Sequence, residues 1–402
     1  MRTLSLMRSA IAILVLAAST VHAESSDLNI YGFMSVGVGV LDNDNVTIEG
    51  FEGEGNFKQD TILALQVTKQ VNDKTTATGQ LVSRGTDDFK TEAAWAFVSY
   101  QATEDFTARM GRLRIPFFYY SEFLEVGYAY NWVRLPSDIY NIPFSSFDGV
   151  DFTQRFSIGS LDSSIQINYG RLTDELNIFD EDYKADLRNM AGISLNSTYG
   201  DWGFRLGGQR TEMTLEVETS TAYQLAVMTG TDPAQAAKDN NLRRIDQGQS
   251  SAALLAGQYQ LDVDTAEEFV FDGHAADFYN AAITYDNGNY SFIAEVTATE
   301  YESGLLVDNR AWLTSVAKRM GSTTTHLTYS TSRDVLNSGD SGKLQEALNL
   351  QGEDESVTLG LRYDYDVNTA LKLEAQYHDE LVHQGEKGDH AMLYSFAVDV
   401  IF

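Results

Sequence analysis

The chain has 402 residues, with 58 acidic and 28 basic side chains, a formal net charge of −30 and no cysteine. This charge disfavours nucleic acid as a partner, because binding to phosphates requires clustered Lys and Arg. The absence of cysteine excludes disulfides, thiol chemistry and cysteine-ligated metal sites.

The first 23 residues have the pattern of a secretory signal peptide. Arg2 and Arg8 supply positive charge, residues 10–18 are apolar, and Ala23 ends a small-x-small cleavage site. The apolar stretch is too short for a transmembrane helix, and no other segment is longer. We therefore expect residues 1–23 to be removed on export, and any membrane role of residues 24–402 to come from strands.

Short segments with a period of two follow along the rest of the chain. Val150 and Phe152, for example, fall on one face of a segment, and Asp151 and Thr153 on the other. Such alternation predicts strands with one apolar and one polar face. The predicted strands are residues 28–40, 61–70, 76–84, 94–101, 106–115, 150–158, 165–169, 191–199, 202–207, 279–285, 290–299, 311–317, 323–330, 357–364, 371–378 and 392–402.

Short turns and long loops alternate between the predicted strands. Asn287-Gly288 is a strong hairpin signal and stands for the short turns. Long loops are expected between Tyr169 and Ala191, and at residues 332–355. The longest connection, residues 211–276, is interpreted as an extended extracellular insertion with some helix.

The expected fold is all-β, a transmembrane antiparallel β-barrel of about sixteen strands with long extracellular loops. Strands of roughly nine to eleven residues cross a bilayer at a tilt. A sheet in hydrocarbon must close on itself, because every backbone N–H and C=O needs an internal partner. A soluble sandwich would also alternate, but it would not need long loops on one side only.

One connection, residues 116–149, differs from the others in composition. It begins at Pro116, closes at Asp148-Gly149, and is rich in aromatic and acidic residues. It is the third long loop, and we expect it to fold into the barrel and narrow the pore. Its aromatic residues either form a surface for sugars or, as we favour, pack the loop against the wall. They are Phe117, Phe118, Tyr119, Tyr120, Phe123, Tyr128, Tyr130, Trp132 and Tyr140.

Charged side chains in the narrow zone of a channel set its selectivity, because little bulk water screens them there. The candidate acids of this constriction are Glu122, Glu125, Asp138, Asp148 and Asp151. The candidate bases on the wall are Arg84, Arg112, Arg114, Arg155 and Arg205. The alternative for each arginine is a solvated or structural charge in the lumen. Arg134, on the loop itself, either joins them or pins the loop to a nearby acid.

Three parts of the sequence resemble Gram-negative outer-membrane porins. Residues 394–402 resemble the C-terminal assembly signal, with apolar residues at alternate positions and a final Phe402. Residues 28–33 resemble the opening strand, and residues 110–116 with 147–150 resemble the flanks of the third loop. The resemblance implies a sixteen-stranded barrel, usually a trimer, whose third loop enters the lumen. The aromatic loop and the 211–276 insertion depart from the best-known members, which leaves substrate preference open.

The favoured function is passive diffusion of small hydrophilic solutes and ions through the outer membrane. The bilayer, lipopolysaccharide and two further copies of the chain are the expected partners, with no cofactor and no metal. The acidic total suggests a weak preference for cations. The first alternative is a substrate-specific channel for an oligosaccharide or an anion such as phosphate.

Two further alternatives are disfavoured. An outer-membrane enzyme would need a grouped catalytic set, whereas the His residues are scattered without metal-ligand spacing and no Gly-x-Ser-x-Gly motif occurs. An adhesin or structural barrel would need a filled lumen, and a barrel of sixteen strands is too wide for side chains alone to fill.

Overall fold

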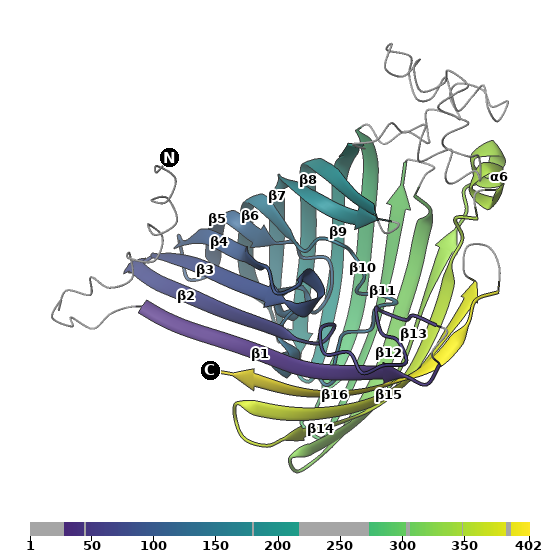
Figure 1. The fold of residues 1–402 in the computed structure, drawn as a ribbon. Coiled ribbons are helices and arrows are strands. Elements are labelled where there is room, and N and C mark those ends of the chain that lie inside the picture. The colour runs from purple at the N-terminus through teal and green to yellow at the C-terminus, as the bar shows by residue number, and fades with distance from the viewer. Residues whose placement is uncertain are drawn as a thin grey trace, which may run out of the picture.

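The computed structural model describes residues 28–43, 46–178, 181–216, 273–302, 306–347, 349–382 and 387–402. The expected signal peptide and most of the expected 211–276 insertion lie outside these residues. Within them, sixteen strands form a closed barrel in which each strand pairs antiparallel with its neighbours in the chain. The first strand pairs with the last and closes the ring (Figure 1). The predicted fold class and strand number are therefore confirmed.

The strands lie close to the predicted segments, and most extend a few residues further towards the long loops. They are β1 (Leu28–Leu41), β2 (Ile62–Asn72), β3 (Thr75–Arg84), β4 (Thr91–Gln101), β5 (Phe106–Arg114), β6 (Ser146–Ile158), β7 (Leu161–Ile178), β8 (Glu181–Tyr199), β9 (Trp202–Glu216), β10 (His274–Asp286), β11 (Tyr290–Tyr301), β12 (Asp308–Met320), β13 (Thr323–Val335), β14 (Glu353–Asp364), β15 (Thr369–Val382) and β16 (His390–Ile401).

The helical elements of the described chain are short and lie in loops. They are the 3-10 turns η1 (Gly85–Asp87), η2 (Ser121–Phe123) and η3 (Gly127–Ala129), and the helix α6 (Gly339–Ala347). Among the described residues, none of the helices has the length and apolar character needed to cross a membrane.

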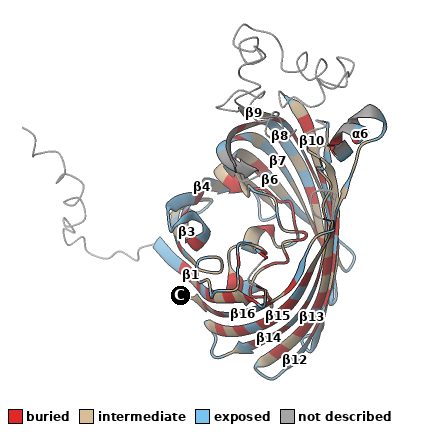
Figure 2. Ribbon diagram, turned by 45° about the vertical axis from the view of Figure 1, so that its right-hand side comes forward, coloured by how far each residue is buried: buried red, intermediate tan, exposed pale blue. Residues whose placement is uncertain are grey.

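Burial alternates along the strands, as the red and pale blue segments of Figure 2 show. On β16, Leu393, Ala397 and Asp399 are buried, whereas Tyr394 and Phe396 are exposed. The exposed apolar side chains form the lipid-facing surface, and the buried set faces the interior. The period of two in the sequence thus follows from lipid on one side of the wall and polar groups on the other.

The prediction of a long loop between Tyr169 and Ala191 is wrong. β7 continues to Ile178 and β8 begins at Glu181, with pairing that runs unbroken from Leu172–Leu187 to the tip. Apolar alternation ends where the bilayer ends, because both faces then meet water, while the backbone hydrogen bonds continue. The alternation of apolar residues therefore marks the part of each strand that lies in the membrane, and not the full length of the strand pairing.

The third long connection, residues 115–145 and called L3 here, lies inside the ring of strands (Figure 1). It ends four residues earlier than expected, because β6 already begins at Ser146, which pairs with Arg114 on β5. Both ends of L3 therefore leave the barrel wall at one place. The hydrogen bonds described next place its middle against strands on the opposite side of the barrel.

Candidate pore constriction

Basic side chains on the far wall hold the backbone carbonyls of L3. The Lys372 Nζ atom on β15 donates hydrogen bonds to the carbonyls of Gly127 at 2.6 Å and Trp132 at 2.5 Å. Arg362 on β14 donates to the Tyr130 carbonyl at 2.8 Å. A loop buried in a barrel has no strand partner for these carbonyls, so the wall supplies charged donors instead.

Acidic side chains on the same wall hold backbone N–H groups of L3. Glu295 on β11 accepts from the Tyr119 amide at 2.7 Å, and Glu374 on β15 accepts from the Val133 amide at 2.9 Å. Both carboxylates are buried in the interior. L3 is thus fixed by charged groups of both signs, and these wall residues were not among the sequence candidates.

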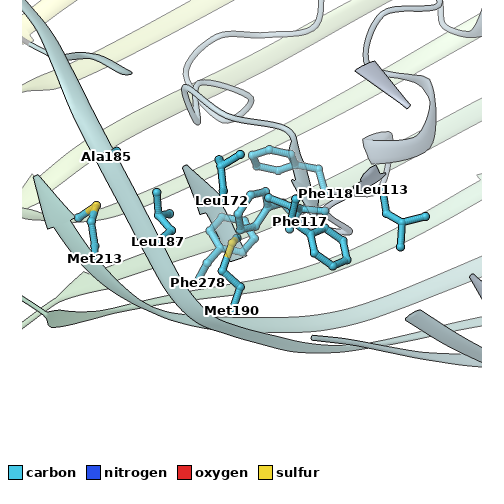
Figure 3. Packing of buried hydrophobic residues seen from close by; sticks show 11 residues of the cluster. Leu113, Phe117, Phe118, Leu172, Ala185, Leu187, Met190, Met213 and Phe278 are labelled. Carbon is cyan, nitrogen blue, oxygen red and sulfur yellow. The ribbon is translucent and has the colours of Figure 1, made fainter. Parts of the chain in front are cut away.

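The aromatic residues of L3 form its core. Phe117 and Phe118 pack edge-on against Phe278 of β10, with ring centroids 4.8 and 5.3 Å apart, within the cluster drawn in Figure 3. Trp132 is buried in a second cluster, and its indole N–H donates to Thr328 Oγ1 of β13 at 2.8 Å. The favoured interpretation, that the aromatics chiefly pack the loop, is therefore confirmed for these residues.

Open space remains on the other side of L3, along β2–β5. One cavity of about 480 Å³ opens towards the short turns, with Asn368 and Phe402 in its lining. A second cavity, of about 510 Å³, opens towards the long loops, with Thr86 in its lining. Arg114 and Glu125 belong to the lining of both cavities, so these two side chains stand where the cavities meet.

Glu125 of L3 bridges two arginines of the wall at this point. Its Oε2 atom lies 2.7 Å from Arg114 of β5, and its Oε1 atom contacts Arg84 of β3. The Glu125 side chain is 10% exposed and that of Arg114 is 3% exposed. Burial by itself raises the pKa of Glu125, but the charges and hydrogen bonds of Arg114 and Arg84 outweigh it and hold the pKa below its usual value.

A second group of charges lies beside Glu122 of L3. Arg109 on β5 contacts Asp151 of β6 at 2.5 Å and Glu122 at 3.4 Å. Arg109 and Asp151 are directly opposite each other in the β5–β6 register. The sequence placed Asp151 among the candidates but missed Arg109, although counting the register of the two strands would have paired them.

The structure does not bring the remaining candidates to the junction of the two cavities. Arg112 pairs with Asp148 at 3.1 Å and lines only the cavity towards the long loops. Arg155 is exposed near the short-turn end of β6. Arg205 donates to the Pro116 carbonyl at 2.5 Å and anchors the start of L3.

Two further charges of L3 point away from the junction. Asp138 accepts a hydrogen bond from Ser330 of β13 at 2.6 Å, on the far side of the loop. Arg134 binds Asp60 with both Nε and Nη2, at 2.8 and 2.5 Å. Of the two roles left open for Arg134, the structure favours the one in which it pins the loop.

Comparison with known proteins agrees with this architecture. Salmonella typhi OmpF, solved with daunomycin, is 12% identical to the chain with a TM-score of 0.57, covering 94% of this chain and 98% of its own. An anion-selective porin from Comamonas acidovorans is 12% identical with a TM-score of 0.55, covering 94% of this chain and 100% of its own. The trimer form of Vibrio cholerae OmpT is 12% identical with a TM-score of 0.53, covering 93% and 99%.

These likenesses show the fold alone, because the identities are low. No curated protein sequence matches the chain. The sequence pattern that describes the Gram-negative porin family, however, matches residues 10–399, which is nearly the whole chain. Together with the closed barrel of sixteen strands, this match shows that the chain belongs to the Gram-negative porins, the channel-forming barrels of the outer membrane.

Proposed function

We propose that the chain is a passive diffusion channel for small hydrophilic solutes and ions, and that its pore runs between L3 and the wall of β2–β5. The observation that carries this proposal is the shared lining of the two cavities at Arg114 and Glu125. On the opposite side of L3, two apolar clusters and the hydrogen bonds of Lys372 and Glu295 hold the loop against the wall. Solutes would therefore pass the Glu125–Arg114 pair.

The charges along this route favour cations weakly. The cavity towards the short turns is lined by Arg114 on one side and by Glu122 and Glu125 on the other. The cavity towards the long loops is lined by three bases, Arg84, Arg112 and Arg114, and by four acids, Asp87, Glu92, Glu125 and Asp174. Each of the two cavities is therefore lined by one more acid than base. Opposed charges across a narrow gap produce a transverse field, and the excess acid sets its sign.

The alternative of an anion-specific channel has less support. Arg84 and Arg114 both pair with Glu125, and Arg112 pairs with Asp148, so the arginines of the route are compensated. An oligosaccharide channel would need aromatic faces open to the lumen. Phe117, Phe118 and Trp132 are each less than 10% exposed, so of the L3 aromatics Phe123, which is 52% exposed and lines the cavity towards the short turns, is the one best placed to stack on a sugar.

The outer surface supports a homotrimer joined through β1–β5. The exposed side chains of these strands are mostly aliphatic or absent, as at Val36, Leu65, Gly79 and Leu81. The exposed surface of β6–β16 instead carries many aromatic side chains, which prefer the membrane interface. They include Phe152, Tyr169, Tyr199, Trp202, Phe204, Tyr279, Tyr290, Trp312, Tyr363, Tyr377, Tyr394 and Phe396. On β1–β5 the exposed aromatic side chains are few, with Tyr31 and Tyr100 among them, and such a face is better suited to contact with another copy.

The test of this function is conductance in a planar lipid bilayer. Purified protein should insert as stepwise increases of current that are ohmic at low voltage. In a salt gradient, the reversal potential should have the sign of a weakly cation-selective pore. A preparation from the same host without the gene is the control. A folded barrel that inserts without passing ions would contradict the proposal.

A further inference from the structure

A third cavity lies on the far side of L3, away from the proposed pore. It has a volume of about 200 Å³ and lies between the β1–β2 loop, L3 and strands β13–β15. Its lining contains four carboxylates and one imidazole and has no Lys or Arg: Glu49, Asp138, Asp354, Glu380 and His378, with Thr47, Ile48, Ser137, Asn141 and Ser332. Such a concentration of negative charge is costly unless a cation compensates it.

The strand register forces two of these acids together. Asp354 on β14 is directly opposite Glu380 on β15, and Ser332 on β13 is opposite Asp354 on its other side. Like charges directly opposite each other on neighbouring strands destabilise a sheet. A cation held between the two carboxylates would relieve this repulsion.

His378 is oriented towards this pair. Its Nδ1 atom lies 3.1 Å from the Ser356 hydroxyl, its opposite neighbour on β14, and its Nε2 atom lies 3.6 Å from Asp354 Oδ1. A hydrogen bond at one ring nitrogen is the usual way in which proteins aim the other nitrogen at a metal. His378 is buried, so its ring has few alternative positions.

We propose that Asp354, His378 and Glu380 bind a divalent transition-metal cation such as Zn²⁺. One ligand atom from each residue lies within 4.8 Å of the other two. Ligands at about 2.0–2.2 Å from Zn²⁺ are separated by about 3.4 Å in a tetrahedral site, so side-chain movements of about 1 Å would close the set. An imidazole with two carboxylates favours Zn²⁺ over Ca²⁺ or Mg²⁺, which prefer oxygen alone.

Asp138 connects the proposed cation site to L3. It is 4% exposed, lines the same cavity, and gives one carboxylate oxygen to Ser330. Glu49, from the β1–β2 loop, accepts a hydrogen bond from Ser137 and lies 3.7 Å from the Arg134 guanidinium. A cation in the cavity would attract both acids, and so would hold L3 and the β1–β2 loop against β13–β15.

The test is Zn²⁺ titration of the folded, chelator-treated barrel in detergent by calorimetry, with Co²⁺ absorption as the second readout. The wild-type chain should bind one Zn²⁺ per chain and give the visible bands of a low-coordinate Co²⁺ site. His378→Gln and Asp354→Asn should each weaken binding at least tenfold, because even loss of an outer-shell partner costs about 10–100-fold. Ser356→Ala should give an intermediate loss.

Asp379→Asn is the matched control. Asp379 lies between His378 and Glu380 in the sequence, but its carboxylate accepts from the Tyr377 hydroxyl on the other face of β15. This variant should bind Zn²⁺ as the wild type does. Circular dichroism and bilayer conductance of each variant would verify folding. The proposal is overturned if the wild type binds no Zn²⁺, or if His378→Gln and Asp354→Asn bind it with unchanged affinity.

Discussion

The Glu125 carboxylate of L3 lies 2.7 Å from the Arg114 guanidinium of β5, and both side chains line the two cavities on this side of the loop. The pair therefore lies at the junction between the cavity that opens to one end of the barrel and the cavity that opens to the other. Arg84 contacts the second oxygen of Glu125, so one loop acid is held by two bases of the wall. The position of L3 therefore determines the charge at the junction of the two cavities.

Removing the charge of Glu125 should shift ion selectivity. Glu125→Gln leaves Arg84 and Arg114 without their shared partner, so the route becomes more favourable to anions. A charge contact at 4 Å is worth about 1 kcal/mol in water, which corresponds to about a fivefold change in the cation-to-anion permeability ratio. Reversal potentials in a salt gradient measure it. Asp138→Asn, on the other face of L3, should leave the ratio unchanged.

The charge of Glu125 should persist into acid solution. Its two arginines hold its pKa below the usual 4.5, despite the opposing effect of burial. A depressed pKa means that its stabilisation is complete above the usual value and is lost as the pH falls through the lower, folded-state pKa. The contribution of Glu125 to selectivity should thus be constant from pH 7 to about 5. A loss that begins near pH 6, in the difference between wild type and Glu125→Gln, would contradict this.

Lys372 should be important for stability because it neutralises a buried carboxylate. Lys372 and Asp399 form an ion pair of 2.7 Å, with side chains 0% and 1% exposed. Lys372→Met would strand a buried carboxylate, at a cost of about 3–5 kcal/mol. It would also release the carbonyls of Gly127 and Trp132, so the open-channel current should become noisier. Urea unfolding and single-channel recording provide the measurements.

A double variant separates the two effects of Lys372. In the double variant Lys372→Met with Asp399→Asn, no buried carboxylate is left without a partner, but the hydrogen bonds to L3 are still lost. Most of the lost stability should return, whereas the current noise should remain. Equal stability of the single and double variants would show that the buried charge is not the cause.

The trimer surface can be tested with glycines. A Cβ added at Gly79, on the exposed face of β3, meets no atom within 4 Å, so Gly79→Trp should not disturb the folded barrel. If β1–β5 contact a second copy, the added ring should block assembly and give monomers in native electrophoresis. Gly208→Trp on β9, where an added Cβ makes ordinary contacts with Tyr279 at 3.7 Å and the Phe278 carbonyl at 3.8 Å, should remain trimeric. Equal assembly of both variants would contradict this surface.

The strands could be predicted from the sequence because lipid imposes a strict period. On β16, the exposed Tyr394 and Phe396 alternate with the buried Ser395 and Ala397, and β13 and β14 follow the same rule. The rule ends at the membrane surface, which is why the sequence predicts a loop between Tyr169 and Ala191 where β7 and β8 continue. The direction of L3 could be inferred only from its place as the third long connection.

The partners within the site depend on the path of L3, which no local pattern specifies. Glu125 faces the arginines while Asp138 faces Ser330, although both were equal candidates in the sequence. The pairing of Asp354 with Glu380, by contrast, can be predicted from the sequence. Counting ten residues back from Asp364 and ten forward from Ala370, the pair at the hairpin, arrives at these two acids.

The most direct test of the pore route is thiol labelling during conduction. The chain has no cysteine, so Glu125→Cys creates a single thiol. A bulky charged methanethiosulfonate reagent should then reduce the current of an open channel in discrete steps, one for each pore. Ser137→Cys, on the other side of L3, should react with no change in current. Complete modification of Glu125→Cys that leaves the conductance unaltered would contradict a pore between L3 and β2–β5.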